Sequence, residues 1–308
     1  KTGEIQMALF GDVFLAQMLG EYNATSIPFV FPDIESVEAY WASIEEEVSQ
    51  SVLDNGNMLI VGRQRRAPRM LTAGKEILHP SDLSGFKLRV PETEFYMTVW
   101  GALGAITTPV NFSELYTALQ TNVVDGQENP IETNYSAGLQ EVQEYTMLTA
   151  HINTHYTWAV NADFYNSLPA EYQEAFDKAC EEALAEVNAG LEERQNVIVE
   201  EMEAAGHTFV EVDYAEWQAA AMDGIQKCME TLSPAAQDAV KQYLPEISTE
   251  SREKIEEIVK IHVEWDSFMA KHYPNIRKRG RVATTGEDDP AAGSSMESYL
   301  RCELMSYS

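Results

Sequence analysis

The segment from Asp82 to Glu92, DLSGFKLRVPE, combines a turn, a short apolar strand and a proline that stops the strand. We expect the strand over Phe86–Val90, because its apolar residues lie between turn residues and a proline. A helix is predicted over Thr93–Leu103, with Gly104 as its C-cap. A strand followed by a helix is the unit from which α/β folds with a mainly parallel sheet are built.

The same alternation extends along most of the chain. Further strands are predicted at Ile5–Leu9, Met58–Val61, Val123–Asp125, Tyr145–Thr149, Tyr156–Val160 and Thr208–Val212. Helices are predicted at Val13–Glu21, Glu35–Leu53, Ser113–Gln120, after Asn129-Pro130, from Pro169 to about Ala205, and at Tyr214–Leu232, Pro234–Tyr243 and Thr249–His272. The helix after Pro169 is long enough to brace two domains or to break near Asn188–Gly190. Residues 274–308 lack the pattern and are expected to form a flexible tail.

The charge is strongly acidic and unevenly distributed. The 308 residues include 50 acidic and 21 basic ones, for a formal net charge of −29. Nucleic-acid partners and adsorption to anionic lipid are therefore not expected, since both need a cationic face. Seven of the 21 cations lie between residues 63 and 89, and none lies between 90 and 177. This cation island consists of Arg63, Arg65, Arg66, Arg69, Lys75, Lys87 and Arg89.

The cation island has two interpretations. Arg63, Arg65 and Arg66 fit a solvated basic loop that offsets the acidic bulk. Arg69 and Arg89 fit an anion site better, because apolar residues flank both of them. An arginine in a strand that enters a core needs a partner, and a small carboxylate ligand supplies one through two parallel hydrogen bonds.

Motifs for catalysis and cofactors are missing from the sequence. It has no phosphate-binding, dinucleotide, serine-hydrolase, zinc-protease or calcium pattern, so we predict no catalytic residue and no cofactor. His151 and His155 are four residues apart, but the residues between them favour strand or loop, so no metal site is predicted. Cys180, Cys228 and Cys302 are too widely spaced to predict a disulfide framework. No run of ~18 apolar residues occurs, so no membrane insertion is predicted.

Several motifs follow one another in a fixed order between Pro68 and Tyr145. They are PRMLT (68–72), DLSGFKLRVPE (82–92), GALGA (101–105), TPVNFSELYTALQT (108–121), VVDGQENP (123–130) and EVQEY (141–145). This succession closely resembles the solute-binding receptors of TRAP transporters, the C4-dicarboxylate receptor family. Together with the helical stretch after Pro169, the resemblance covers most of residues 1–272.

The resemblance implies an α/β, two-lobed fold like that of periplasmic binding proteins, with a long helix bracing both lobes. Residues 1–66 and 155–194 would form lobe I, and residues 67–154 and 195–273 would form lobe II. Family members usually begin with a strand–helix–strand unit before the segment that matches Gly3 to Leu9. We therefore expect lobe I to be N-terminally incomplete. Residue 1 is Lys and not Met, which predicts a processed, cloned or truncated form of the chain, and no signal peptide is visible in it.

The resemblance also implies a binding site. In that family an arginine in the strand before the Val-Pro motif pairs with the ligand carboxylate, and this position is Arg89. A second basic residue falls on Arg69, an asparagine that contacts the carboxylate falls on Asn129, and an aromatic that lines the cleft falls on Phe112. Candidates for contact with the distal part of the ligand are Glu92, Tyr96, His155 and Tyr156.

The implied function is that of a non-enzymatic, periplasmic and monomeric receptor. It would bind a C4-dicarboxylate or a sugar acid such as a uronate and deliver it to the membrane permease of a TRAP transporter. One alternative is a ligand sensor of the same fold that signals to a receptor kinase. Another is an enzyme that clamps a carboxylate substrate with Arg89 and uses Glu128 or Glu92 as base.

Overall fold

The structure is a computed structural model that describes residues 3–245, except for the side chains of Asp12, Val13, Phe14 and Gln17. The helix predicted over Thr249–His272, the end of the predicted lobe II and the predicted tail at 274–308 lie outside the described residues. Within residues 3–245, no helix is both long and apolar enough to cross a bilayer.

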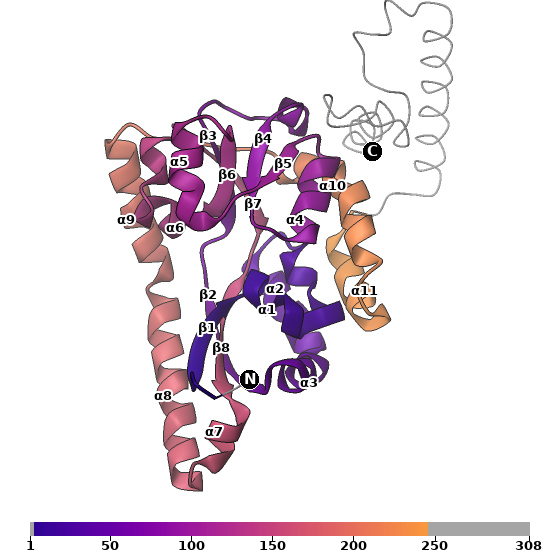
Figure 1. Cartoon of the computed structure of the whole chain (residues 1–308), viewed down its shortest axis with the longest axis vertical. Helices are drawn as coiled ribbons and strands as arrows, with labels where there is room; N and C mark the ends of the chain where they lie inside the picture. The colour runs from indigo at the N-terminus through magenta and orange to yellow at the C-terminus, as the bar shows by residue number, and fades with distance from the viewer. Residues whose placement is uncertain (1–2, 246–308) are drawn as a thin grey trace, which may run out of the picture.

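Two separate β-sheets organise the chain (Figure 1). The three-stranded sheet has β8 (His155–Asn161) between β1 (Met7–Gly11) and β2 (Met58–Arg65), and both pairings are antiparallel. The six-stranded sheet has the order β5 (Ile106–Pro109), β4 (Lys87–Val90), β6 (Gly126–Pro130), β3 (Arg69–Ala73), β7 (Tyr145–Ile152) and β9 (Thr208–Val210).

The prediction of a mainly parallel sheet is confirmed for the six-stranded sheet, in which β3 is the one reversed strand, and is wrong for the three-stranded sheet, whose pairings are antiparallel. β4 runs parallel to β5 and β6, and β7 runs parallel to β9, but β3 is antiparallel to both of its neighbours. The reason lies in the chain path: β3 continues from β2 of the other sheet and enters between β6 and β7. The α/β class and the two lobes, one around each sheet, agree with the prediction.

Helices cover both sheets (Figure 1). Those nearer the three-stranded sheet are α1 (Asp12–Leu19), α2 (Ile34–Ser43), α3 (Glu45–Gly56) and α7 (Ala162–Ser167). Those nearer the six-stranded sheet are α4 (Glu94–Ala102), α5 (Leu115–Gln120), α6 (Ile131–Ser136) and α10 (Tyr214–Met229). The last α-helix of the described residues is α11 (Pro234–Val240), which contacts α2 and is followed by the 3-10 turn η6 (Lys241–Tyr243).

The long helix predicted after Pro169 is two helices, α8 (Ala170–Ala189) and α9 (Leu191–Ala204), with a break at Gly190. α8 packs on β2 of the three-stranded sheet, and α9 packs on α6 and β9 beside the six-stranded sheet. The pair therefore braces both lobes, with its break between the parts that contact each one.

The prediction of a single helix over Glu35–Leu53 is wrong. This stretch forms two helices, α2 and α3, which are separated at Ile44, because the φ of −134° at Ile44 is not helical. The three glutamates Glu45–Glu47 lie in the first turn of α3, where the positive end of the helix dipole favours them. This local preference favours the start of a new helix over continuation of α2.

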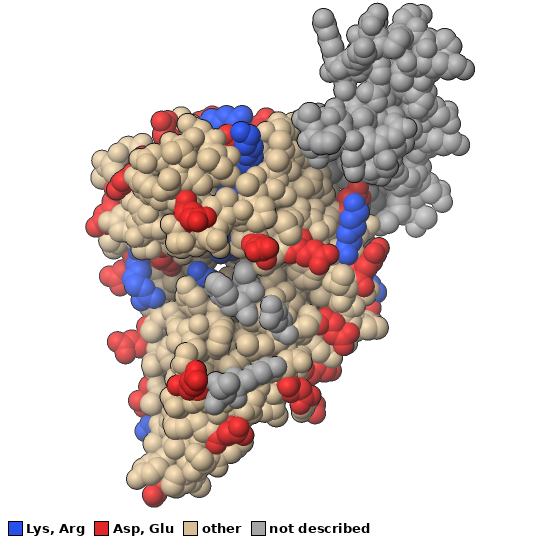
Figure 2. All heavy atoms as spheres, in the orientation of Figure 1, with Lys and Arg blue, Asp and Glu red and all other residues tan. Residues whose placement is uncertain are grey.

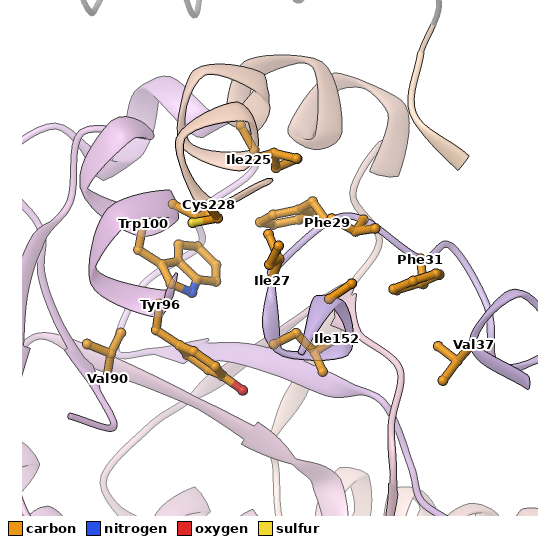
Figure 3. Close-up of a cluster of buried hydrophobic side chains, with 14 of the residues drawn as sticks. Ile27, Phe29, Phe31, Val37, Val90, Tyr96, Trp100, Ile152, Ile225 and Cys228 are labelled. Atoms are coloured by element: carbon orange, nitrogen blue, oxygen red, sulfur yellow. The ribbon is translucent and has the colours of Figure 1, made fainter. Parts of the chain in front are cut away.

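A buried aromatic cluster joins the two lobes (Figure 3). Phe29 follows α1 in the chain, yet its ring lies 5.5 Å from Trp100 of α4 and 5.9 Å from Trp217 of α10, centroid to centroid. Its backbone N–H donates to the carbonyl oxygen of His151 in β7 at 2.6 Å. The segment around Phe29 is therefore anchored in the core between the lobes.

Candidate functional site

A cavity of about 290 Å³ receives side chains from both sheets. The six-stranded sheet and its connections contribute Arg69, Arg89, Pro91, Tyr96, Phe112, Asn129, Thr133 and Ile152. The three-stranded sheet and its connections contribute Gly11, Thr25, Ser26, Arg66, Thr154 and Tyr156. In Figure 2 this face of the molecule is hollowed between its two halves, and Lys or Arg atoms are visible inside the hollow. Elsewhere in that view acidic groups are scattered over the surface, and further basic groups lie near the top and the right edge.

Arg89 is a buried cation in the lining of this cavity. It lies in β4 and is 4% exposed, and its Nε donates to the carbonyl oxygen of Val110 at 2.9 Å. Among residues 3–245, no carboxylate forms an ion pair with Arg89. Burial lowers the pKa of Arg89, but an arginine keeps its proton in a protein. The cavity therefore contains a buried cation whose two terminal nitrogens are available for an external anion, and burying a charge without such a partner is costly.

Arg69 is already engaged by the protein. Its Nε donates to Glu128 Oε2 at 2.5 Å, and its Nη2 donates to Glu128 Oε1 at 2.8 Å and to the Glu128 carbonyl oxygen at 2.7 Å. Burial opposes the charged form, yet the Glu128 carboxylate holds the pKa of Arg69 above its ordinary value. These bonds occupy Nε and Nη2 of Arg69. Arg69 is therefore a second cation of the cavity, and the carboxylate of Glu128 largely balances its charge.

Glu128 is held ionised by two neighbours. Burial would raise the pKa of its carboxyl, but Arg69 and the hydrogen bond from His151 lower it overall. His151 Nε2 lies 3.0 Å from Glu128 Oε2, and His151 Nδ1 lies 2.8 Å from the Thr149 hydroxyl. A neutral imidazole that donates from Nε2 and accepts at Nδ1 satisfies both contacts.

Asn129 lies near the end of β6, one residue before the N-cap of α6, which begins directly after Asn129-Pro130 as predicted. Its Oδ1 accepts a hydrogen bond from Arg69 Nη2 at 3.0 Å, and its Nδ2 donates to Gln127 Oε1 at 2.6 Å. This amide thus lines the cavity in a fixed orientation.

Three predicted aromatic residues line the same cavity. Tyr96 extends from α4 under Arg69, whose guanidinium carbon is 5.6 Å from the ring centroid. Figure 3 shows its hydroxyl directed away from the aromatic cluster around Trp100. Phe112 is 48% exposed, and Tyr156 in β8 is half-buried. Their rings supply apolar walls beside the cationic groups.

The structure does not bring Glu92 and His155 to the cavity. Glu92 follows Pro91 at the end of β4 and is exposed. His155 is the neighbour of Tyr156 in β8, and successive side chains of a strand point to opposite faces. The His155 ring is buried with Nε2 at 3.4 Å from Glu38 Oε1. Within the described part of the chain, no three His, Cys, Asp or Glu side chains gather as a metal ion would require.

Comparison with known proteins identifies the family. The model of the family "Bacterial extracellular solute-binding protein, family 7" matches residues 1–232. The chain belongs to this family. A second model, for a protein family of unknown function (DUF4125), matches residues 166–308.

Family 7 relatives share part of their length with this chain. A solute-binding protein of Roseobacter denitrificans is 35% identical over 204 residues, which are 65% of this chain and 62% of the relative. The C4-dicarboxylate-binding periplasmic protein DctP of Vibrio cholerae is 28% identical over 188 residues, which are 61% of this chain and 57% of the relative. The chain thus spans less than two thirds of the length of these curated relatives.

Solved structures of TRAP periplasmic solute-binding proteins share the fold. A TRAP periplasmic solute-binding protein from Roseobacter denitrificans with bound L-galactonate has a TM-score of 0.69 and 32% identity, and the match covers 78% of this chain and 79% of that one. Another from the same organism, with bound β-D-glucuronate, has a TM-score of 0.72 and 25% identity, covering 78% and 80%.

Several cavity residues of this family 7 protein are missed by sequence reasoning. Arg66 belongs to the cation island, and from the sequence we assign it to a solvated basic loop. In the structure Arg66 lines the cavity, and its guanidinium carbon lies 4.0 Å from the centroid of the Tyr156 ring. Arg63 and Arg65 do pair with acids of the surrounding helices, at 2.7 Å to Glu45 and 2.6 Å to Glu38. Thr25, Ser26, Thr133 and Thr154 carry no signal in the sequence that separates them from other hydroxyl residues.

We predict that the free energy of unfolding decreases as the pH falls below about 6.5, the unfolded-state pKa of histidine. Burial, together with the charge of Arg69, lowers the pKa of His151 despite the raising effect of Glu128. The unfolded state therefore takes up a proton first. Stability from neutral His151 is present above that pH and is lost as the pH falls through the lower folded pKa.

Denaturant unfolding at about pH 7.5 and about pH 5.5 measures this effect. His207, whose pKa burial also lowers, contributes a decrease in the same direction. The variant His151→Gln isolates the contribution of His151 and should show a smaller decrease than the unchanged protein. Equal decreases in the two proteins would contradict the assignment to His151.

Proposed function

We propose that this chain is a receptor for a small organic acid and that it holds the carboxylate of that acid at Arg89. The observation that carries the proposal is the buried guanidinium of Arg89, which lines the cavity and lacks a carboxylate partner among residues 3–245. An arginine binds a carboxylate through two parallel hydrogen bonds, which gives both energy and orientation. Asn129 and the apolar walls add a polar contact and exclude water.

Relatives support this choice of ligand class. The Vibrio cholerae relative is named for binding C4-dicarboxylates, and the two Roseobacter denitrificans structures hold L-galactonate and β-D-glucuronate. All of these molecules carry a carboxylate, which is the group that Arg89 would recognise. The remaining candidate site residues are Arg69, Asn129, Phe112, Tyr96 and Tyr156, which line the cavity.

We further propose that the two lobes close on the acid by hinge bending. The division into residues 1–66 and 155–194 against 67–154 and 195–273 is supported by the points where the chain passes between sheets. These are the link from β2 to β3, the link from β7 to β8 and the break at Gly190. The Asn188 side chain accepts from the Arg65 backbone N–H at 2.8 Å and so ties two of these points together.

In this proposal the closed receptor is periplasmic and monomeric and delivers the acid to a TRAP membrane permease. A ligand sensor of the same fold would bind in the same way and differ only in its partner. The enzyme alternative gains no support from Glu128, because a carboxylate held ionised by Arg69 is a weak base.

A thermal-shift screen tests the proposed function. Organic acids that bind at Arg89 should raise the melting temperature, since a ligand at 100 times its dissociation constant adds ~2.7 kcal/mol to stability. The screen includes C4-dicarboxylates, uronates and aldonates, with the corresponding uncharged sugars as controls. If no acid raises the melting temperature, or if sugars raise it equally, the proposed function is wrong.

A further inference from the structure

Thr25 carries a buried hydroxyl that no group within residues 3–245 satisfies. It lies in η2 (Ala24–Ser26), a single 3-10 turn between α1 and α2, and it lines the cavity. The residue is 1% exposed, and its Oγ1 has no hydrogen-bond partner within residues 3–245. A buried hydroxyl without a partner is unfavourable, so most such groups in folded proteins are bonded. The exception at Thr25 faces a space that a ligand can fill.

The turn that presents Thr25 is held firmly. Its neighbour Ser26 donates from Oγ to Asn23 Oδ1 at 2.8 Å, and the Tyr40 hydroxyl donates to the Tyr22 carbonyl oxygen at 2.7 Å. On the other side, Phe29 is fixed in the aromatic cluster and by its bond to the His151 carbonyl oxygen. Thr25 therefore occupies a defined position without contributing a hydrogen bond to it.

Thr25 and Arg89 belong to different lobes. Arg89 projects from β4 of the six-stranded sheet, whereas η2 follows α1 beside the three-stranded sheet. An acid held by its carboxylate at Arg89 would present its other end to the opposite wall. Resting on the proposed function, we infer that Thr25 is a specificity-determining residue that hydrogen-bonds a hydroxyl group on the part of the ligand distal to that carboxylate.

The chemistry of the wall favours a hydroxylated acid. A threonine hydroxyl both donates and accepts, which matches another hydroxyl, and Thr133 and Thr154 add further hydroxyl groups to the lining. A second carboxylate on the ligand would instead need a second cation, and of the other two arginines in the lining Arg69 pairs with Glu128 and Arg66 lies over the Tyr156 ring. The substrate class that the lining fits is therefore a monocarboxylic acid with several hydroxyl groups, such as an aldonate or a uronate.

Calorimetric titration with four probes tests this inference. The hydroxylated probes are L-galactonate and D-glucuronate, hexanoate has six carbons and one carboxylate but no hydroxyl, and succinate has a second carboxylate. The unchanged protein should bind at least one hydroxylated probe more than about tenfold tighter than hexanoate and succinate. Thr25→Val removes the hydroxyl at nearly constant shape and should weaken that probe about tenfold, the upper end of what one hydrogen bond contributes. Thr25→Ser keeps the hydroxyl and should stay within about threefold.

Melting temperatures without ligand separate recognition from a structural role. Because Thr25 Oγ1 makes no hydrogen bond among the described residues, Thr25→Val should melt at the same temperature as the unchanged protein or higher. A large decrease would overturn the inference. So would unchanged affinity of Thr25→Val for the hydroxylated probe, or tighter binding of succinate than of either hydroxylated probe. If the acids bind, Arg89→Ala abolishes their binding and Thr25→Val leaves the affinity unchanged, only the inference about Thr25 fails. If no acid binds, both the inference and the proposed function fail.

Discussion

Replacing Arg89 with alanine should weaken the binding of organic acids more than tenfold. The substitution removes a buried cavity cation that forms no ion pair with a carboxylate within residues 3–245, and charged hydrogen bonds contribute about 1.5–3 kcal/mol. Arg89→Lys should also weaken binding, because an ammonium group cannot form the two parallel bonds of a guanidinium. The measurement is calorimetric titration with the acid that gives the largest thermal shift.

The matched control is Arg63→Ala. Arg63 belongs to the same cation island, but it pairs with Glu45 and lies over the Trp41 ring outside the cavity. Its removal changes the net charge by the same amount and should leave affinity within about twofold, since Arg63 does not line the cavity. Equal affinity of Arg89→Ala and the unchanged protein, or equal losses in the two variants, would refute the role of Arg89.

Replacing Glu128 with glutamine should lower the free energy of unfolding by about 3–5 kcal/mol, the usual effect of breaking a buried ion pair. The substitution keeps the size of the side chain but leaves the Arg69 guanidinium, which is 7% exposed, without its counter-charge. It also alters the partner of His151 Nε2. Denaturant unfolding monitored by fluorescence gives the free energy directly.

The control for Glu128 is Glu38→Gln. Glu38 pairs with Arg65 at 2.6 Å, but both side chains are more than one-third exposed, so its loss should cost about 0–1 kcal/mol. If both variants lower the free energy of unfolding by a similar small amount, the Arg69–Glu128 ion pair does not stabilise the protein at this site. The substitution Glu128→Gln leaves the charge of Arg69 without its counter-charge at the cavity, so this variant should also change acid affinity. Glu38→Gln should not change it.

The alternation of strands and helices was predictable because each element carries its own apolar pattern and turn residues. The order of the strands was not. β3 joins β6 and β7 across a large separation in the chain, and no local pattern around Arg69 states that its strand is antiparallel to both. The break at Ile44 separates two segments that each form a helix, and one amphipathic pattern runs through both of them. The sequence pattern therefore did not show where one helix ends and the next begins.

The cation at the site was predictable, but its partners were not. Arg89 stands in an apolar strand within a small island of basic residues, and that contrast is visible in the sequence. The partner of Arg69 is one acid among 50, at a separation of 59 residues, so only the fold selects Glu128. Thr25 cannot be picked out from the sequence, because only the three-dimensional structure shows that its hydroxyl is buried and has no hydrogen-bond partner among residues 3–245.

The most direct test is a crystal structure of the protein with the acid that raises its melting temperature most. We expect the acid in the cavity between the sheets, with one carboxylate about 2.7–2.9 Å from the terminal nitrogens of Arg89. A carboxylate bound away from Arg89, or an Arg89 guanidinium paired with an aspartate or glutamate of the protein itself, would contradict the account.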